Sequence, residues 1–211
     1  MRLFVGLDLP EDLRLTLGTL RTGISGARWM APESYHITLR FIGEADRHQA
    51  ADLDDALADI DAPAFDLAFD GVGSFASRGR LRAIWAGVES SGALCHLHDK
   101  VERAAIRAGF TPEDRKFKPH VTLARFKGTP EFAAGRFLED HAGFTSRMFT
   151  VERFVLFEST LGGEGAHYTP IRDYPLGLFG YDDAFADLAD DYADQGYAEQ
   201  DYAEQEAKVY S

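Results

Sequence analysis

The sequence predicts an α+β protein whose sheets are largely antiparallel, and three observations support this class. Strand-like alternation recurs along residues 1–180, apolar residues at helical spacing lie between those segments, and neighbouring strands can pair as hairpins. Helices interleaved with hairpins favour this class over a parallel, doubly wound sheet. A chain of 211 residues, 45% of them hydrophobic, is long enough to bury a substantial core.

The apolar pattern and local signals place the individual elements. A helix begins at Pro10, because proline and the acidic residues after it suit a first helical turn. Gly109 ends a later helix, and residues 73–80, rich in Gly, Ser and Arg, form the turn of a hairpin. The expected helices are 10–24, 46–60, 94–108 and 130–141, and the expected strands are 3–7, 35–42, 65–69, 81–88, 121–126, 148–158 and 167–174.

The net charge of −13 is concentrated at one end of the chain. Residues 181–211 contain ten Asp or Glu side chains and one Lys, which leaves residues 1–180 with a net charge of −4. The same segment has a tyrosine every five residues, at Tyr192, Tyr197 and Tyr202, which matches neither a helical nor a strand period. We therefore expect one domain over 1–180 and a disordered, acidic, low-complexity tail over 181–211. The near-neutral domain remains able to bind an anionic ligand.

Composition favours a cytoplasmic protein without a membrane segment, and we expect a monomer. No apolar run approaches the ~20 residues of a membrane span, and the start of the chain lacks the apolar core of a secretory signal. The single cysteine, Cys95, cannot form an internal disulfide or a thiolate metal cage. His96 and His98 diverge on a helix and cannot easily chelate one ion. No metal and no cofactor are expected.

Two segments 84 residues apart repeat one pattern. They read His36-Ile37-Thr38-Leu39-Arg40-Phe41 and His120-Val121-Thr122-Leu123-Ala124-Arg125-Phe126. Because side chains alternate along a strand, each histidine shares one face with the threonine two residues later, and the aliphatic residues share the other face. A single histidine in a strand is usually structural, but its repetition within this pattern indicates a functional pair.

With these paired His-x-Thr motifs the chain resembles the 2H phosphoesterase superfamily, and within it the bacterial RNA 2′,3′-cyclic phosphodiesterases, also called 2′-5′ RNA ligases. The resemblance extends over residues 1–178 and includes Trp29, Trp85 and Lys118-Pro119-His120. It implies a bilobal fold in which two pseudo-symmetric halves face a central cleft. It also implies metal-independent opening of a terminal 2′,3′-cyclic phosphate of RNA to a 2′-phosphomonoester. Substrates would be tRNA fragments or oligonucleotides, with 2′-5′ ligation as the reverse reaction.

The motif residues suit this chemistry by themselves. Opening a cyclic phosphodiester takes a base that activates water and an acid that protonates the departing oxygen. Two imidazoles, with an ordinary pKa of about 6.5, can supply one neutral and one protonated ring at neutral pH. The hydroxyls of Thr38 and Thr122 can donate to the non-bridging phosphate oxygens. The resemblance makes His36 the general acid and His120 the general base, whereas the symmetry of the sequence leaves these roles open.

Four further residues are candidates for substrate binding. Arg125 matches a phosphate-contacting arginine of the family, but strand alternation points it away from His120 unless a bulge or the strand end re-aims it. Arg40 has the alternation that shares a face with His36, and a salt-bridged structural role is equally open for it. Tyr168, which follows a Gly-rich loop, and Phe41 can stack on the terminal base, with a core role as the alternative for Phe41.

Three other functions remain open at this point. The same site can act on small cyclic nucleotides in place of RNA ends. The chain can also be a non-catalytic RNA- or nucleotide-binding module on the same fold, although binding alone does not need two titrating groups. Finally, it can be an adaptor that acts through its acidic tail.

Overall fold

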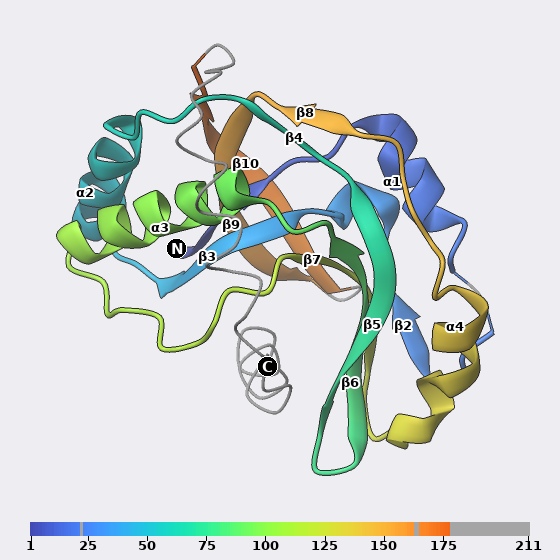
Figure 1. Cartoon of the computed structure of the whole chain (residues 1–211). Coiled ribbons are helices and arrows are strands. Elements are labelled where there is room, and N and C mark those ends of the chain that lie inside the picture. Colours follow the sequence, from blue (N-terminus) through green and yellow to red (C-terminus); the bar gives the residue numbers. More distant parts are fainter. Residues whose placement is uncertain (22, 163–164, 178–211) are drawn as a thin grey trace.

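The computed structural model describes residues 1–21, 23–162 and 165–177 (Figure 1). Two short 3₁₀ turns, Pro32–Ser34 and Glu131–Ala134, lie among the regular elements. The helices and strands in chain order are β1 (Arg2–Leu7), α1 (Glu11–Gly18), β2 (Ala27–Trp29), β3 (Ile37–Glu44), α2 (Arg47–Ala58), β4 (Phe65–Leu67), β5 (Phe69–Ser77), β6 (Arg80–Val88), α3 (Gly92–Arg107), β7 (His120–Phe126), α4 (Gly135–Asp140), β8 (Phe149–Val151), β9 (Arg153–Gly162) and β10 (Gly165–Pro175).

Within the described residues the strands form two four-stranded sheets and one two-stranded sheet. The first sheet has the order β10-β9-β1-β3, and the second has the order β2-β7-β6-β5. Their strand pairs are all antiparallel. The two-stranded sheet joins β4 to β8. The predicted α+β class with largely antiparallel sheets is therefore confirmed.

A strand–helix–strand unit occurs once in each large sheet. In the first sheet, β1 is followed by α1 and, after β2 and a 3₁₀ turn, by β3, which pairs with β1. In the second sheet, β6 is followed by α3 and β7, and β7 pairs with β6. The motif strands β3 and β7 therefore hold corresponding places in the two units, although β3 is an edge strand and β7 lies between β2 and β6. Figure 1 shows β3 and β7 approaching each other near the centre of the molecule.

One large apolar core joins the helices to both sheets. The aliphatic face of each motif belongs to this core, since Ile37, Leu39, Val121 and Leu123 are at most 3% exposed. Burial of these side chains supplies the main driving force that fixes the two strands in place. The histidine–threonine faces consequently point away from the core, as the alternation of the sequence predicts.

Local capping signals explain where two of the predicted helices begin. Asp46 accepts hydrogen bonds from the backbone N–H groups of His48 and Gln49, and the Gln49 side chain accepts one from the Asp46 N–H in return. This capping box starts α2. The Ser91 hydroxyl accepts a hydrogen bond from the backbone N–H of Leu94 and starts α3 in the same manner.

Several boundaries differ from the predicted ones. Helix α1 ends at Gly18, although the apolar pattern continues to residue 24. Most of the stretch 73–80 is strand, because β5 and β6 are joined by only Arg78 and Gly79, whose φ angles of 52° and 68° form a tight hairpin turn. The expected strand 65–69 divides between β4 and β5, and β2 is absent from the prediction. Strands of three residues are too short to show an alternating pattern.

The predicted acidic tail over 181–211 lies outside the described residues. Among the helices that the structure does describe, none has both the length and the apolar content that crossing a membrane requires.

Candidate active site

The backbone holds His36 and His120 in the same way. His36 lies between a 3₁₀ turn and β3, and its Nδ1 is 2.8 Å from the carbonyl oxygen of Ser34. His120 begins β7, and its Nδ1 is 2.7 Å from the carbonyl oxygen of Lys118. Since a carbonyl oxygen only accepts, each Nδ1 carries a proton and donates it. Nε2 is therefore the nitrogen that can exchange a proton with a ligand in both rings.

Aromatic rings of the first sheet fix the orientation of His36. The centroid of its half-buried imidazole lies 4.7 Å from that of Phe4 and 4.8 Å from that of Tyr168, which meets it edge-on. The Phe157 ring follows at 6.1 Å. This packing leaves the ring few alternative rotamers, so its Nε2 has a defined direction.

His120 has a corresponding aromatic surrounding in the second sheet. Its ring is 8% exposed and lies 5.0 Å from Phe75 and 6.0 Å from Trp85, measured between ring centroids. The indole of Trp85 lies against the backbone of Gly73, where a Cβ atom would be 2.1 Å from the ring. Residue 73 must therefore be glycine for Trp85 to take this position.

A bulge in β3 changes the side to which Arg40 points. Thr38 pairs with Gly6 of β1 and Arg40 pairs with Val5, which leaves Leu39 as an extra residue. Leu39 and Arg40 are both turned to the interior, with 3% and 7% exposure. The expectation that Arg40 shares a face with His36 is therefore wrong, because alternation is interrupted immediately after the motif.

The second motif has a bulge at the corresponding position, three residues after its histidine. This bulge turns Arg125 toward the face of the motif histidine and threonine, whereas the bulge in β3 turns Arg40 away from it. Across β6, Thr122, Ala124 and Arg125 pair with Trp85, Ile84 and Ala83, which leaves Leu123 as the extra residue. Since residues 83 and 85 share one face of β6, Arg125 shares the face of Thr122. The bulge that Arg125 requires in order to face the cleft is present.

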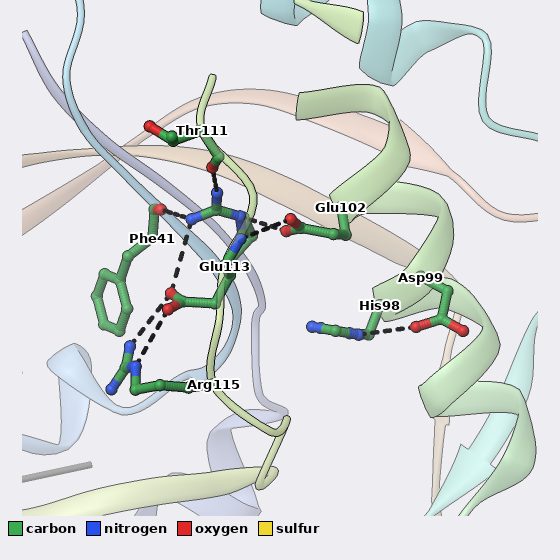
Figure 2. Close-up of polar contacts among 8 residues, drawn as sticks. Phe41, His98, Asp99, Glu102, Thr111, Glu113 and Arg115 are labelled. Atoms are coloured by element: carbon green, nitrogen blue, oxygen red, sulfur yellow. Dashed lines mark hydrogen bonds and ion pairs between the residues drawn. The ribbon is translucent and has the colours of Figure 1, made fainter. Parts of the chain in front are cut away.

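Arg40 instead belongs to an ion cluster with Glu102 and Glu113, two carboxylates that Figure 2 labels. Its guanidinium pairs with Glu102 of α3 and with Glu113 at 3.7 Å, and it donates to the carbonyl oxygen of Thr111. Glu113 also accepts two hydrogen bonds from Arg115, at 3.1 and 3.2 Å. Two carboxylates thus already neutralise Arg40, so the structure supports the salt-bridged role and not the expected contact with a phosphate.

Phe41 and Tyr168 both lie near His36. The Phe41 ring is 6.0 Å from that of Phe4, and the Tyr168 ring is 5.2 Å from it, so both join the cluster around Phe4 and Phe157. Both side chains are half-buried. The structure therefore brings the two expected stacking candidates to one side of the first histidine.

A small hollow joins the two motifs. Its lining includes Thr38 and Phe41 from β3, His120 from β7, and the paired side chains of Arg40, Glu113 and Arg115. Thr122 follows two residues after His120 and pairs with Trp85 on the same sheet face. His36 lines a different pocket, together with Phe157 and Tyr168. The hollow therefore brings Thr38 of the first motif and His120 of the second motif together.

The sequence did not indicate every residue that shapes this site. Phe4, Phe75 and Phe157 enclose the histidines, and Arg115 lines the hollow between the motifs. The phenylalanines come from β1, β5 and β9, so only the order of strands in the sheets shows that they are close to the histidines. In the sequence, Gly73 is the one signal that could have indicated the position of Trp85. Glycine inside a strand often marks a place where another group comes close to the backbone.

Two titratable side chains of α3, His98 and Cys95, are partly buried by packing. The His98 ring stacks on Phe117 at 4.1 Å, and its Nδ1 is 3.2 Å from Asp99 Oδ1. Burial lowers the pKa of His98, and it raises the pKa of the Cys95 thiol. Over the described ranges of the chain, no group of three or more His, Cys, Asp or Glu side chains is arranged to hold a metal ion.

Both histidines are fixed through Nδ1, and each is followed two residues later by a threonine. Each pair belongs to a strand–helix–strand unit that occurs in both large sheets. This arrangement defines a two-histidine phosphoesterase of the 2H class. The comparison with known families agrees. A sequence model described as LigT-like phosphoesterase matches residues 7–85 and 88–168. The chain belongs to this family.

Individual relatives are similar over most of the chain. The RNA 2′,3′-cyclic phosphodiesterase of Archaeoglobus fulgidus is 32% identical over 176 residues, which cover 82% of this chain and 98% of the relative. The protein of the same name from Bacillus subtilis is 31% identical, with 82% and 95% covered. The crystal structure of E. coli LigT with 3′-AMP has a TM-score of 0.68 at 26% identity, with 83% of this chain and 97% of that chain covered. This likeness confirms the expected bilobal fold.

Proposed function

We propose that this protein opens the 2′,3′-cyclic phosphate at an RNA end to give a 2′-phosphomonoester. The observation that carries the proposal is the pair of imidazoles held through Nδ1 by equivalent carbonyl groups, each beside a threonine on the same face. The relatives named RNA 2′,3′-cyclic phosphodiesterase support the choice of substrate. So does E. coli LigT, which was crystallised with a ribonucleotide, 3′-AMP.

In the proposed reaction the two histidines exchange protons on opposite sides of the phosphorus. Nε2 of His120 takes a proton from water as the water oxygen bonds to phosphorus. The bond from phosphorus to O3′ breaks, and Nε2 of His36 gives its proton to the departing oxygen. The phosphate remains on O2′. His120 is then protonated and His36 is neutral, and proton exchange with solvent restores the starting state of both rings.

The threonines and Arg125 stabilise the charge that builds up on the non-bridging oxygens. Thr38 and Thr122 donate from the two halves, and Arg125, re-aimed by the bulge, supplies a positive charge from the same face as Thr122. Tyr168 and Phe41 stack on the terminal base from the side of His36. Arg40 has no part in binding, because its charge is neutralised within the ion cluster.

The proposal also covers the substrates, the cellular location and the oligomeric state. The substrates are tRNA fragments or oligonucleotides with a cyclic phosphate end, and the protein acts as a cytoplasmic monomer. Hydrolysis of small cyclic nucleotides is the alternative activity. A non-catalytic binding module is disfavoured, because binding alone does not call for two titrating groups with equivalent backbone partners.

A direct test is incubation of an RNA ending in a 2′,3′-cyclic phosphate, with a 2′,3′-cyclic mononucleotide in parallel. The proposal predicts that the wild-type protein consumes the cyclic phosphate of the RNA. It also predicts that His36→Ala still binds the RNA but does not consume it. Binding by the wild type without consumption of either substrate would identify a binding module.

Removing one threonine hydroxyl should slow the chemical step more than it weakens binding. We expect Thr122→Val to lower kcat about 100-fold with little change in KM, because one donor to the developing charge is lost. Thr122→Ser, which keeps the hydroxyl, should retain most of the activity. Thr16→Val, on the exposed side of α1, is the matched control. Unchanged kcat in both Thr38→Val and Thr122→Val would contradict the role of the hydroxyls.

Chelation of divalent metals should leave the reaction intact. Each step of the proposed mechanism uses imidazole, hydroxyl or guanidinium groups of the chain, so we expect EDTA to change kcat/KM by less than about twofold. Steady-state rates before and after treatment, with the chelator removed again, measure this. Loss of turnover that returns only with added metal would contradict the mechanism.

A further inference from the structure

A pocket of about 400 Å³ lies beside His120 and is not used by the mechanism. Trp85 and Gly87 of β6 line it, and Gly87 pairs with His120 of the neighbouring strand β7. Lys118 and Pro119, which also line it, directly precede His120 in the chain. The pocket is therefore a neighbour of His120 on the second sheet.

The indole of Trp85 offers this pocket a flat aromatic surface. One side of the ring lies against Gly73, as the close approach of a Cβ at that position shows. The Lys118 ammonium lies 4.5 Å from the ring centroid. A nucleobase can take this position on the indole, since aromatic stacking accepts any base, while the flexible lysine side chain turns toward a phosphate.

Charge and polarity around the pocket suit the rest of a nucleotide. Lys116, exposed, and Lys118, half-buried, supply positive charge for a phosphate. Asp70 and Asp99 can accept hydrogen bonds from the exocyclic amino groups of a base. The volume is in the lower part of the range that small-molecule sites occupy, which fits one nucleotide unit.

We propose that this pocket is a second-nucleotide subsite, which binds a nucleotide other than the one carrying the cyclic phosphate. The inference rests on the proposed function, and it makes RNA with two or more nucleotides the preferred substrate over a cyclic mononucleotide. The second nucleotide can come from the same strand or from a separate RNA. In the second case its 5′-hydroxyl gives its proton to His120, bonds to phosphorus and displaces O3′, which leaves a 2′–5′ diester.

The test compares kcat/KM for a trinucleotide and for a mononucleotide that end in the same 2′,3′-cyclic phosphate. The wild type should prefer the trinucleotide by about tenfold or more, which is the scale of one stacked base. Trp85→Leu should remove most of this preference, and Trp85→Phe should keep much of it. Lys118→Met retains the backbone carbonyl that holds His120 and should also reduce the preference. Arg136→Met, where the side chain is 91% exposed on α4, should leave it unchanged.

A second arm identifies the source of the nucleotide. The cyclic mononucleotide is mixed with an oligonucleotide that has a free 5′-hydroxyl, and the products are separated. A 2′–5′ diester that forms with the wild type but not with Trp85→Leu assigns the pocket to a separate RNA, whereas a chain-length preference alone assigns it to the same strand. Equal use of both substrates without diester formation, or a preference unchanged in both Trp85→Leu and Lys118→Met, would overturn the subsite. A wild type that opens neither substrate would instead refute the proposed function.

Discussion

Replacing either catalytic histidine by asparagine is expected to lower kcat by about 1,000-fold, within the range that a positioned acid or base contributes. Asparagine keeps an N–H that can donate to the carbonyl oxygen of Ser34 or Lys118, but it has no nitrogen that titrates. The substitution therefore removes proton transfer while preserving the local hydrogen bond of each site. Single-turnover rates with a cyclic-phosphate RNA measure the effect separately from product release.

The pH dependence of these variants assigns the two roles. The wild type should show a bell-shaped profile of kcat/KM, since one ring must be neutral and the other protonated. The residual activity of His120→Asn should lose the acidic limb, because no base remains to be protonated, and that of His36→Asn should lose the basic limb. His48→Asn, on the exposed surface of α2, is the control. Full activity in either active-site variant would contradict the mechanism.

Removing the charge of Arg40 is expected to destabilise the protein by about 3 kcal/mol. Arg40→Met keeps the volume of the side chain but leaves Glu102 and Glu113, whose side chains are 17% and 15% exposed, without their shared cation. Equilibrium unfolding in urea measures the loss of free energy. The cluster links β3 to α3 and to the segment before His120, so the loss concerns the contact between the two halves of the molecule.

Two comparisons show whether this loss belongs to the ion cluster. Arg136→Met, which removes an exposed partner of Asp140, should leave the unfolding curve nearly unchanged. Glu102→Gln combined with Arg40→Met should cost less than the sum of the two single changes, because the pair acts as a unit. Unaltered stability together with a collapse of kcat/KM in Arg40→Met would show that Arg40 contacts substrate after all.

The sequence was sufficient to predict the two motifs and their faces. Each alternates between an aliphatic residue and His or Thr, and a period of two is a property of a single strand that needs no tertiary contact. Ile37 and Val121 are accordingly fully buried in the core. The start of α2 is equally local, because its capping residues lie within four positions of one another.

The orientation of the two arginines could not be predicted in the same way. A bulge is defined by the pairing of two strands, and nothing within the motif marks Leu39 or Leu123 as the extra residue. One insertion reverses the facing of every later residue in the strand. Strict alternation places Arg40 on the face of His36 and Arg125 on the face opposite to His120, and the two bulges reverse both facings.

The aromatic surroundings of the histidines depend on long-range pairing as well. Phe4 reaches His36 from β1, and Phe75 reaches His120 from β5, the outer strand of the second sheet. In the sequence both phenylalanines are indistinguishable from ordinary core residues. Their proximity to the histidines follows from strand order, which hydropathy patterns do not specify.

The position of the phosphate in the product tests the central claim most directly. An RNA ending in a 2′,3′-cyclic phosphate is incubated with the wild-type protein, and the terminal phosphate is assigned to O2′ or O3′ by phosphorus NMR. Displacement of O3′ between His36 and His120 predicts a 2′-phosphomonoester as the sole product, and no product with the variant that carries both His36→Asn and His120→Asn. A 3′-phosphomonoester, or the same product at an undiminished rate from that variant, would contradict the two-histidine mechanism.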